Sequence, residues 1–358
     1  MHSFGKQPQT SVAIARRSNI DRLSIVIVTY KRQGLLRDLL DSIASLAGKP
    51  WRIVVVDNED SSDTARMVDE LDSRLEAAWG PSDPDDRGGT RRAVYFPQAD
   101  NLGGAGGFSA GIRCAYGLGA RWFWLMDDDV TCEPDAIGKL ARWTGRFDVI
   151  QGSRLDFDGG AFYWMYRFIT PLGIPSPFAT SDLGPAGYRP TNQLCFEGGL
   201  VSRRVVDAIG LPDPRYFIYG DDAVYGYLAS KHFRTAVVAD VILRRARAIS
   251  SWDIAGKRQL NSTSDATRYY IMRNRGYTAR YLRCNGDYHR VLYGIGTAAT
   301  LAKELIRIVM VDRSFATGIP ALIRGMRDAR KVYRDRSWKP MPPLAPKRRT
   351  AGHVAPVL

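Results

Sequence analysis

Cysteine and histidine are scarce in this sequence of 358 residues, which contains four of each. The cysteines are widely separated and form no C-x-x-C pair, which argues against a zinc ribbon or a disulfide framework and favours a reducing compartment. Two of the histidines, His2 and His353, lie near the ends of the chain, so we expect no histidine-rich metal site. The composition, 45% hydrophobic and 25% charged, is that of a globular protein and excludes a mostly disordered chain.

Long apolar runs are also absent. No stretch reaches the ~18–20 uninterrupted apolar residues of a membrane-spanning helix. The sequence before Arg16-Arg17 has no apolar segment of the kind found in signal peptides. We therefore expect a protein that stays on the cytoplasmic side of the membrane.

Acidic residues are rare in the last part of the chain. The formal net charge is +14, but residues 1–260 carry only +1 of it, and residues 261–358 carry 19 basic against 6 acidic side chains. Basic regions of this kind typically bind nucleic acid, an anionic membrane or phosphorylated ligands. Because the rest of the chain is near neutral and no nucleic-acid-binding motif is present, we predict a membrane surface and no nucleic acid.

Strands and helices alternate through the first part of the chain. Short apolar runs at 23–28, 53–56, 93–96 and 122–126 are typical of buried strands, and segments with helical spacing separate them. This alternation predicts a doubly wound α/β sheet, in which ligands bind at the carboxyl ends of the strands.

The remaining segments complete the predicted domain organisation. The pattern over 151–255 predicts a mixed sheet with long loops. Helices are predicted over 265–285 and 297–336, the second of them with a basic face. We therefore divide the chain into four parts: an N-terminal tail at 1–22, an α/β domain at 23–255, a basic helical region at 256–338 and a disordered tail at 339–358.

Three consecutive aspartates, Asp127-Asp-Asp129, end the fourth predicted strand. Alternate residues of a strand point the same way, so Asp127 and Asp129 can share one face. Two carboxylates at a sheet edge suit Mg²⁺ or Mn²⁺, and such an ion neutralises a departing diphosphate. Taken without this context, the motif would be an ordinary solvated turn.

The other candidates are weaker when taken singly. The glycine-rich segment Asn101-Leu-Gly-Gly-Ala-Gly-Gly107 is compatible both with close approach of a ligand and with a tight turn, but it fits neither a dinucleotide fingerprint nor a P-loop. Asp57 is compatible with a nucleoside contact or a turn. Asp221-Asp222 suits a general base as well as a helix cap. Glu197 has apolar neighbours, and Trp164 and Trp252 are candidate sugar platforms.

Together these segments resemble the family 2 glycosyltransferases of GT-A fold, the nucleotide-diphospho-sugar transferases. The resemblance covers about 24–225, and its motifs are Val28-Thr-Tyr-Lys-Arg32, Val56-Asp-Asn58, the glycine-rich segment, Asp127-Asp-Asp129 and Tyr219-Gly-Asp-Asp222. The residue sequences of the last three motifs resemble those of the actinobacterial galactofuranosyltransferases. The length of the chain is similar to that of the member that initiates arabinogalactan synthesis.

This resemblance implies a donor and an acceptor: UDP-galactofuranose and a polyprenyl-diphosphate-linked GlcNAc-rhamnose. It also implies site residues. Uridine and donor contacts fall on Thr29, Arg32, Asp57, Asn101, Gly104 and Asp128. Asp127 and Asp129 would hold Mn²⁺ or Mg²⁺ and the diphosphate. Asp222 would be the general base with Asp221 beside it, and Glu197, Trp164 and Trp252 would face the sugar or acceptor.

One departure concerns the metal. Relatives often carry a metal-binding histidine about two dozen residues after the Asp-Asp pair, but here that segment is Asp240-Val-Ile-Leu-Arg-Arg-Ala-Arg247. Either water or another side chain completes the metal shell, or metal binding is weaker. Arg244, Arg245 and Arg247 are candidates for contacting the diphosphate, and surface exposure is the alternative.

These observations lead to one main hypothesis and one close alternative. The main hypothesis is an inverting, metal-dependent galactofuranosyltransferase of galactan initiation, peripheral on the inner face of the plasma membrane. Its basic helices would lie on anionic lipid. The alternative is a rhamnosyltransferase that uses dTDP-rhamnose on a related lipid-linked acceptor.

Overall fold

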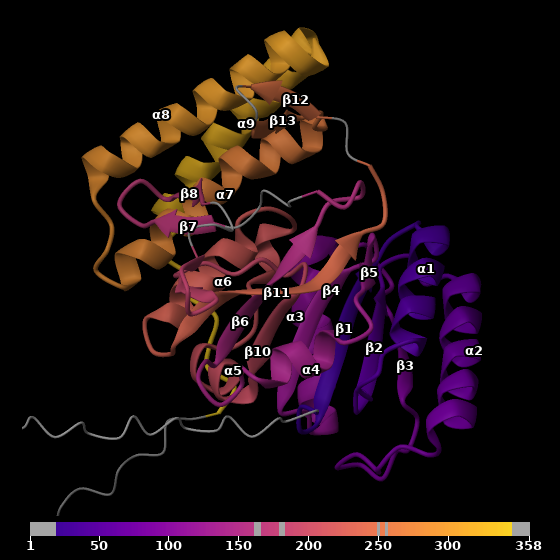
Figure 1. Cartoon of the computed structure of the whole chain (residues 1–358). Coiled ribbons are helices and arrows are strands. Elements are labelled where there is room, and N and C mark those ends of the chain that lie inside the picture. The colour runs from indigo at the N-terminus through magenta and orange to yellow at the C-terminus, as the bar shows by residue number, and fades with distance from the viewer. Residues whose placement is uncertain (1–18, 161–165, 179–182, 249–250, 255–256, 346–358) are drawn as a thin grey trace, which may run out of the picture.

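The computed structural model describes residues 19–160, 166–178, 183–248, 251–254 and 257–345. Within these residues the chain forms one large sheet, two small hairpins and helices on both sides of the sheet. Figure 1 shows the large sheet in the centre, with the C-terminal helices gathered over one end of it. No helix in this part of the chain combines the length and the apolar character needed to cross a membrane.

The first half of the large sheet is parallel, as the alternation predicted. Its strands, in spatial order, are β3 (Ala93–Pro97), β2 (Arg52–Asp57), β1 (Leu23–Thr29) and β4 (Trp122–Asp127). Alternate residues of β1 face opposite layers. Ile25 and Ile27 pack with α1 (Gln33–Ala44) and α2 (Ser62–Trp79), and Val26 and Val28 pack with α3 (Gly103–Leu118). The buried apolar runs thus form a sheet covered on both faces.

The second half of the sheet is mixed, which also agrees with the prediction. The short strand β10 (Gly199–Ser202) runs antiparallel to β4 and to β6 (Val149–Leu155). Next to β6 lies β11 (Thr235–Arg245), which is parallel to it, and β11 also pairs with β5 (Val130–Cys132) and β9 (Tyr188–Pro190). This half brings β10 and β11 close to the carboxyl end of β4.

Short helices and two hairpins complete the structure. The helices are α4 (Ala136–Ala141), α5 (Arg203–Ile209), η2 (Pro214–Tyr216) and α6 (Asp221–Ser230). The hairpins pair β7 (Tyr166–Ile169) with β8 (Ile174–Pro177) and β12 (Ser251–Ile254) with β13 (Lys257–Asn261).

The helix predicted over 297–336 is in fact two helices. After α7 (Asp265–Cys284), α8 (Arg290–Arg307) begins earlier than predicted because the side chain of His289 accepts a hydrogen bond from the backbone N–H of Leu292 at 3.2 Å. A π-helical turn, η3 (Ile308–Asp312), and the left-handed Arg313 (φ 50°) then separate α8 from α9 (Phe315–Arg334). Periodicity alone carries no signal for such a break.

The tail predicted as disordered from residue 339 is partly packed over the residues that the structure describes, 339–345. The buried Trp338 meets Tyr281 edge to face, with ring centroids 5.0 Å apart. Beyond it, Met341 and Leu344 pack against the apolar cluster around α3 and α5, and the backbone N–H of Ala345 donates to the carbonyl of Asp207. The proline-rich composition suggested disorder, but apolar side chains spaced three residues apart anchor this segment.

Candidate active site

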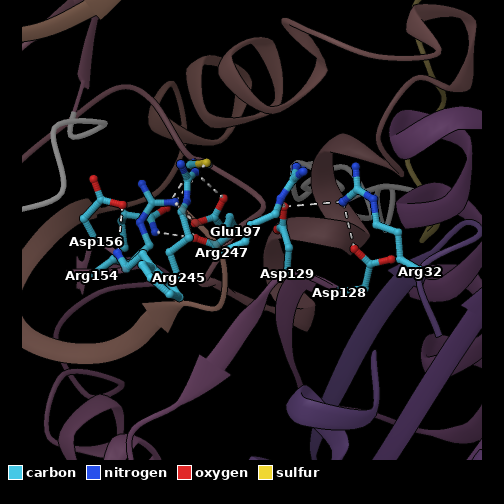
Figure 2. Close-up of polar contacts among 11 residues, drawn as sticks. Arg32, Asp128, Asp129, Arg154, Asp156, Glu197, Arg245 and Arg247 are labelled. Carbon is cyan, nitrogen blue, oxygen red and sulfur yellow. Dashed lines mark hydrogen bonds and ion pairs between the residues drawn. The ribbon is translucent and has the colours of Figure 1, made fainter. Parts of the chain in front are cut away.

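The candidate site lies where β1 and β4 end side by side. The register pairs Val28 with Asp127, so the aspartates start at the level of the last residues of β1. The hydroxyl of Thr29 donates to Oδ2 of Asp128 at 2.8 Å, and Arg32 donates to Oδ1 of the same carboxylate at 3.0 Å. Figure 2 shows Asp128 held against Arg32. Asp128 thus holds the loop that follows β1. Its predicted contact with the donor stays a prediction.

Asp127 and Asp129 meet a third carboxylate. Ligand oxygens of Asp127, Asp129 and Glu197 all lie within 4.8 Å of one another, and we call these residues the acidic triad. The alternation along the strand correctly placed the two aspartates together. Glu197 joins them because it directly precedes the two glycines that open β10, the antiparallel neighbour of β4.

The electrostatics of the acidic triad favour a cation. Burial raises the pKa of Asp127 well above its usual value, and the nearby charges of Asp129 and Glu197 raise it further. Burial also raises the pKa of Glu197. Three carboxylates that lie this close together offer the hard oxygen donors that suit Mg²⁺ or Mn²⁺.

Arginines surround this acidic triad. Nε of Arg247 donates to Oδ2 of Asp129 at 3.0 Å, and the guanidinium of Arg32 lies 3.4 Å from the same oxygen. On the other side, Arg154 and Arg245 lie 3.3 and 3.7 Å from the carboxylate oxygens of Glu197 (Figure 2). These side chains partly balance the charge of the acidic triad.

The three arginines that were candidates for contacting the diphosphate therefore lie in different places. Arg245 and Arg247 reach the acidic triad, but Arg244 points to Glu133, 3.8 Å away. No histidine contacts the acidic triad among the described residues. In relatives this segment often carries a metal-binding histidine. Here its Arg247 contacts Asp129.

Asp221 and Asp222 begin α6, and their different surroundings shift their pKa values to different extents. Asp221 is 8% exposed, and burial together with the charge of Asp222 raises its pKa well above the usual value. Burial raises the pKa of Asp222 to about 6, opposed by a hydrogen bond from the backbone of Ala223, the charge of Arg154 and the Cys195 thiol. With a pKa of about 6, Asp222 is mostly ionised near neutral pH, whereas Asp221 holds its proton more strongly than an ordinary aspartate does.

Arg154 connects Asp222 to the acidic triad. Its guanidinium donates to the Cys195 sulfur at 3.4 Å and to the Glu197 backbone carbonyl at 2.9 Å. Burial raises the pKa of Cys195 to about 12, so the thiol stays protonated beside Asp222. Nothing in the sequence pointed to Arg154 or Cys195, because both roles depend on contacts between β6 and the segment before β10.

The 216–220 loop before α6 is strained and is held from α7. Phe217 and Tyr219 have left-handed backbones with φ of 64° and 69°. The amide nitrogen of Asn274 donates to three carbonyls of this loop: those of Tyr216 at 3.0 Å, Ile218 at 2.7 Å and Tyr219 at 2.8 Å. The basic helical region therefore positions the aspartates, a role that the sequence analysis missed.

The glycine-rich turn contacts the same loop. Gly103 has φ 67°, and a Cβ there would lie 2.2 Å from the carbonyl oxygen of Phe217, so only glycine fits. The side chain of Asn101 accepts a hydrogen bond from the Gly103 N–H at 2.9 Å, and the N–H of Ala105 donates to Phe217 at 3.0 Å. Beside them, a Cβ on Gly104 would meet open space, which leaves room for a ligand.

Asp57 ends β2 at this edge, and its side chain is already bonded. It accepts hydrogen bonds from the N–H groups of Glu59 and Ser61 at 3.0 and 2.8 Å and from the Tyr95 hydroxyl at 3.1 Å. This is the turn role that the sequence left open, and its contact with a nucleoside stays a prediction. Trp164 lies outside the described residues. The backbone of Trp252 lies in β12, but its side chain is not described.

A parallel sheet that ends in an aspartate cluster, followed by a mixed half, defines a glycosyltransferase of the GT-A type. The model of glycosyl transferase family 2 matches residues 24–210, and the chain belongs to this family. It is similar to galactofuranosyltransferase GlfT1 of Mycolicibacterium smegmatis, with 29% identity over 70% of this chain and 81% of that protein. It is also similar to GlfT1 of Mycobacterium tuberculosis, with 30% identity over 55% of this chain and 60% of that protein.

Solved structures share the fold at low identity. Staphylococcus aureus TarS in complex with UDP is 12% identical, with a TM-score of 0.52 over 87% of this chain and 80% of that one. GalNAc-T7 with UDP, GalNAc and Mn²⁺ is also 12% identical, with a TM-score of 0.50 over 87% of this chain and 54% of that one.

Proposed function

We propose that this glycosyltransferase moves galactofuranose from UDP-galactofuranose to a polyprenyl-diphosphate-linked GlcNAc-rhamnose and so begins the galactan of cell-wall arabinogalactan. The observation that carries the proposal is the position of Arg154, which contacts both Cys195, the neighbour of Asp222, and Glu197 of the acidic triad. The similarity to GlfT1 proteins supports the choice of sugar.

The donor lies along the carboxyl edge of the sheet in this proposal. Thr29, Arg32 and Asp128 shape the first loop, and Asp57 and Asn101 border the uridine. The open space at Gly104 lets the donor approach the start of α3. Arg32 and Arg247, whose side chains are 42% and 45% exposed, are accessible to the diphosphate.

Asp127 and Asp129 would hold Mn²⁺ or Mg²⁺, with Glu197 completing the acidic triad. Such an ion, when bound, supplies positive charge that stabilises UDP as it departs. Arg32 and Arg247 add guanidinium groups that suit phosphate oxygens.

The reaction is a single displacement with inversion at the anomeric carbon. Asp222 takes the proton from the acceptor hydroxyl as the oxygen attacks, and UDP leaves from the opposite side. The raised pKa of Asp221 favours its neutral form, which reduces the repulsion of the ionised Asp222. Glu197, Trp164 and Trp252 are proposed to lie near the sugar or the acceptor.

The enzyme acts at the inner face of the plasma membrane in this proposal. The basic charge of residues 261–358 draws it toward anionic headgroups, where a lipid-linked acceptor is held.

A donor panel tests this function. The purified protein, Mg²⁺ or Mn²⁺ and a synthetic lipid-diphosphate GlcNAc-rhamnose acceptor are combined with UDP-galactofuranose, UDP-galactopyranose, UDP-glucose or dTDP-rhamnose, and products are read by mass spectrometry. We expect a hexose added from UDP-galactofuranose alone. Asp222→Asn should abolish transfer and preserve UDP binding. Deoxyhexose transfer from dTDP-rhamnose would instead establish the rhamnosyltransferase.

A further inference from the structure

Helix α8 carries its polar side chains inward and its apolar side chains outward. Its buried face includes Glu304 and Arg307, which form an ion pair of 2.6 Å and are 2% and 8% exposed. Its exposed side chains are almost all apolar, and the pattern continues through η3. The large ones, which we call the outer apolar face, are Val291, Leu292, Ile295, Leu305, Ile306, Val309 and Met310.

This orientation is held in place by specific contacts. The guanidinium of Arg275, buried in α7, donates to Thr297 and Thr300 of α8 at 2.7 and 3.3 Å and to the backbone of the β7–β8 turn. Gly296 of α8 presses on the same turn, where an added Cβ would lie 1.9 Å from the carbonyl oxygen of Leu172. The helix cannot turn its apolar side inward without breaking these contacts.

The charges around the outer apolar face all have one sign. Exposed basic side chains border it at Arg290, Lys303 and Arg313, and α9 adds Arg324 and Arg327. The acidic residues from α8 to α9 are each paired with a basic side chain: Glu304 with Arg307, Asp312 with Arg268 and Asp328 with Lys331. Two copies of this surface would bring like charges together, whereas an anionic lipid surface complements them.

We propose that the outer apolar face inserts into the headgroup region of an anionic bilayer, with the bordering arginines and Lys303 on lipid phosphates. Exposed Phe315, Ile319 and Ile323 extend the same surface onto α9. Figure 1 shows α8 on the outside of the C-terminal helices, away from the sheet. Insertion of an apolar helix face is distinct from electrostatic attraction by the basic region, because it survives high salt.

The proposed surface is linked to the site through the inner face of α8. On that face Thr297 accepts a hydrogen bond from Arg275 of α7 at 2.7 Å, and the neighbouring Asn274 donates to the carbonyl of Tyr219 at 2.8 Å. A membrane under α8 would therefore lie on the side of the molecule that holds the 216–220 loop. That a lipid-linked acceptor would reach the site from this side rests on the proposed function. The membrane contact itself does not.

Vesicle flotation tests the proposal. The full chain is mixed with phosphatidylcholine vesicles, with or without phosphatidylglycerol, at low and high salt. We expect binding to the anionic vesicles that persists in part at high salt, and at least a tenfold loss in Ile295→Asp/Ile306→Asp. The matched control, Ala77→Asp/Ala78→Asp on the exposed side of α2, should bind like the parent. Circular dichroism and thermal melting check that each variant is folded.

Three results would overturn the proposal. They are equal vesicle binding by the α8 variant and its parent, complete release of the parent by salt, and a parent dimer that the α8 substitutions dissociate. A short-chain, water-soluble acceptor separates this test from that of the proposed function. The α8 variant should keep full transfer to it, and a parent that transfers nothing would refute the proposed function and leave the flotation result standing.

Discussion

The side-chain amide of Asn274, in the middle of α7, donates to the backbone carbonyl of Tyr219 at 2.8 Å. Asn274 is 3% exposed and bonds the carbonyls of Tyr216 and Ile218 as well. Buried carbonyls without partners are costly, so one side chain stabilises a backbone path that is otherwise unfavourable. The orientation of Asp221 and Asp222 therefore depends on a residue more than fifty positions further along the chain.

Removing this amide should lower catalysis more than donor binding. In Asn274→Ala we expect kcat to fall by about 10–100-fold, because a displacement of about 1 Å in a catalytic group has effects of that size. Affinity for UDP, measured by calorimetry, should change little. Asn285→Ala is the control, since Asn285 bonds only the end of its own helix. A fall in kcat of equal size in both variants would refute the positioning role.

The acidic limb of the pH profile should report Asp222. Its carboxylate must be deprotonated to act as a base, so kcat/KM should rise with pH and level off above its pKa of about 6. The Cys195 thiol stabilises the ionised form, as does Arg154, and both face Asp222 alongside Asp221. Cys195→Ala should therefore move the limb to higher pH. The exposed Cys284, changed to alanine, should leave it in place. A shift toward lower pH in Cys195→Ala would contradict this assignment.

Arg247 should compete with a divalent cation for Asp129. Its Nε lies 3.0 Å from a carboxylate oxygen of the acidic triad, and the side chain is 45% exposed. Exposed ion pairs contribute ~0.2–1 kcal/mol, so Arg247→Gln should tighten Mn²⁺ binding to the donor-free enzyme by about 2–5-fold. Calorimetric titration with MnCl₂ measures this, and Arg244→Gln is the control because Arg244 points to Glu133. Weaker Mn²⁺ binding in Arg247→Gln would contradict the competition.

Chelation of divalent ions should abolish transfer, and Asp127→Asn should do so without chelator. Burial beside Asp129 and Glu197 raises the pKa of Asp127, which an added cation would relieve. The two treatments are compared by transfer assays with and without EDTA and by thermal melting with added Mn²⁺. Full activity in EDTA would mean that the arginines alone balance the charge of departing UDP.

Trp338 should matter for stability. It is 8% exposed, meets Tyr281 edge to face and lies 5.1 Å from the Arg215 guanidinium. Large-to-small changes of core aromatics cost about 3–5 kcal/mol, so Trp338→Ala should lower the free energy of unfolding by about that amount. Urea unfolding measures it, with exposed Lys339→Ala as the control. An unchanged midpoint would show that the tail contributes no packing energy.

Local patterns in the sequence were sufficient for the parallel half of the sheet and for part of the site. Buried β-branched runs specify β1 and β2, and strand alternation brings Asp127 and Asp129 together. Each of these signals is contained within a few consecutive residues of the chain.

Contacts between distant segments were beyond those patterns. Glu197 reaches the acidic triad because β10 inserts antiparallel between β4 and β6, and nothing near Glu197 in the sequence encodes that pairing. Asn274 looks like any polar residue of a basic helix. For α8 the apolar spacing was visible, but periodicity does not say which side of a helix faces solvent; that depends on Arg275 and on the ion pair of Glu304.

The hydrogen bonds from Asn274 also bear on the order in which the protein becomes functional during translation. The sheet, the acidic triad and both aspartates of α6 leave the ribosome before α7 does. The 216–220 loop cannot obtain its three carbonyl partners until Asn274 has emerged, and the segment around Trp338 follows later still. A nascent chain that has been made only as far as α6 thus carries the acidic triad and both aspartates of α6 without the side chain that bonds the loop in front of them.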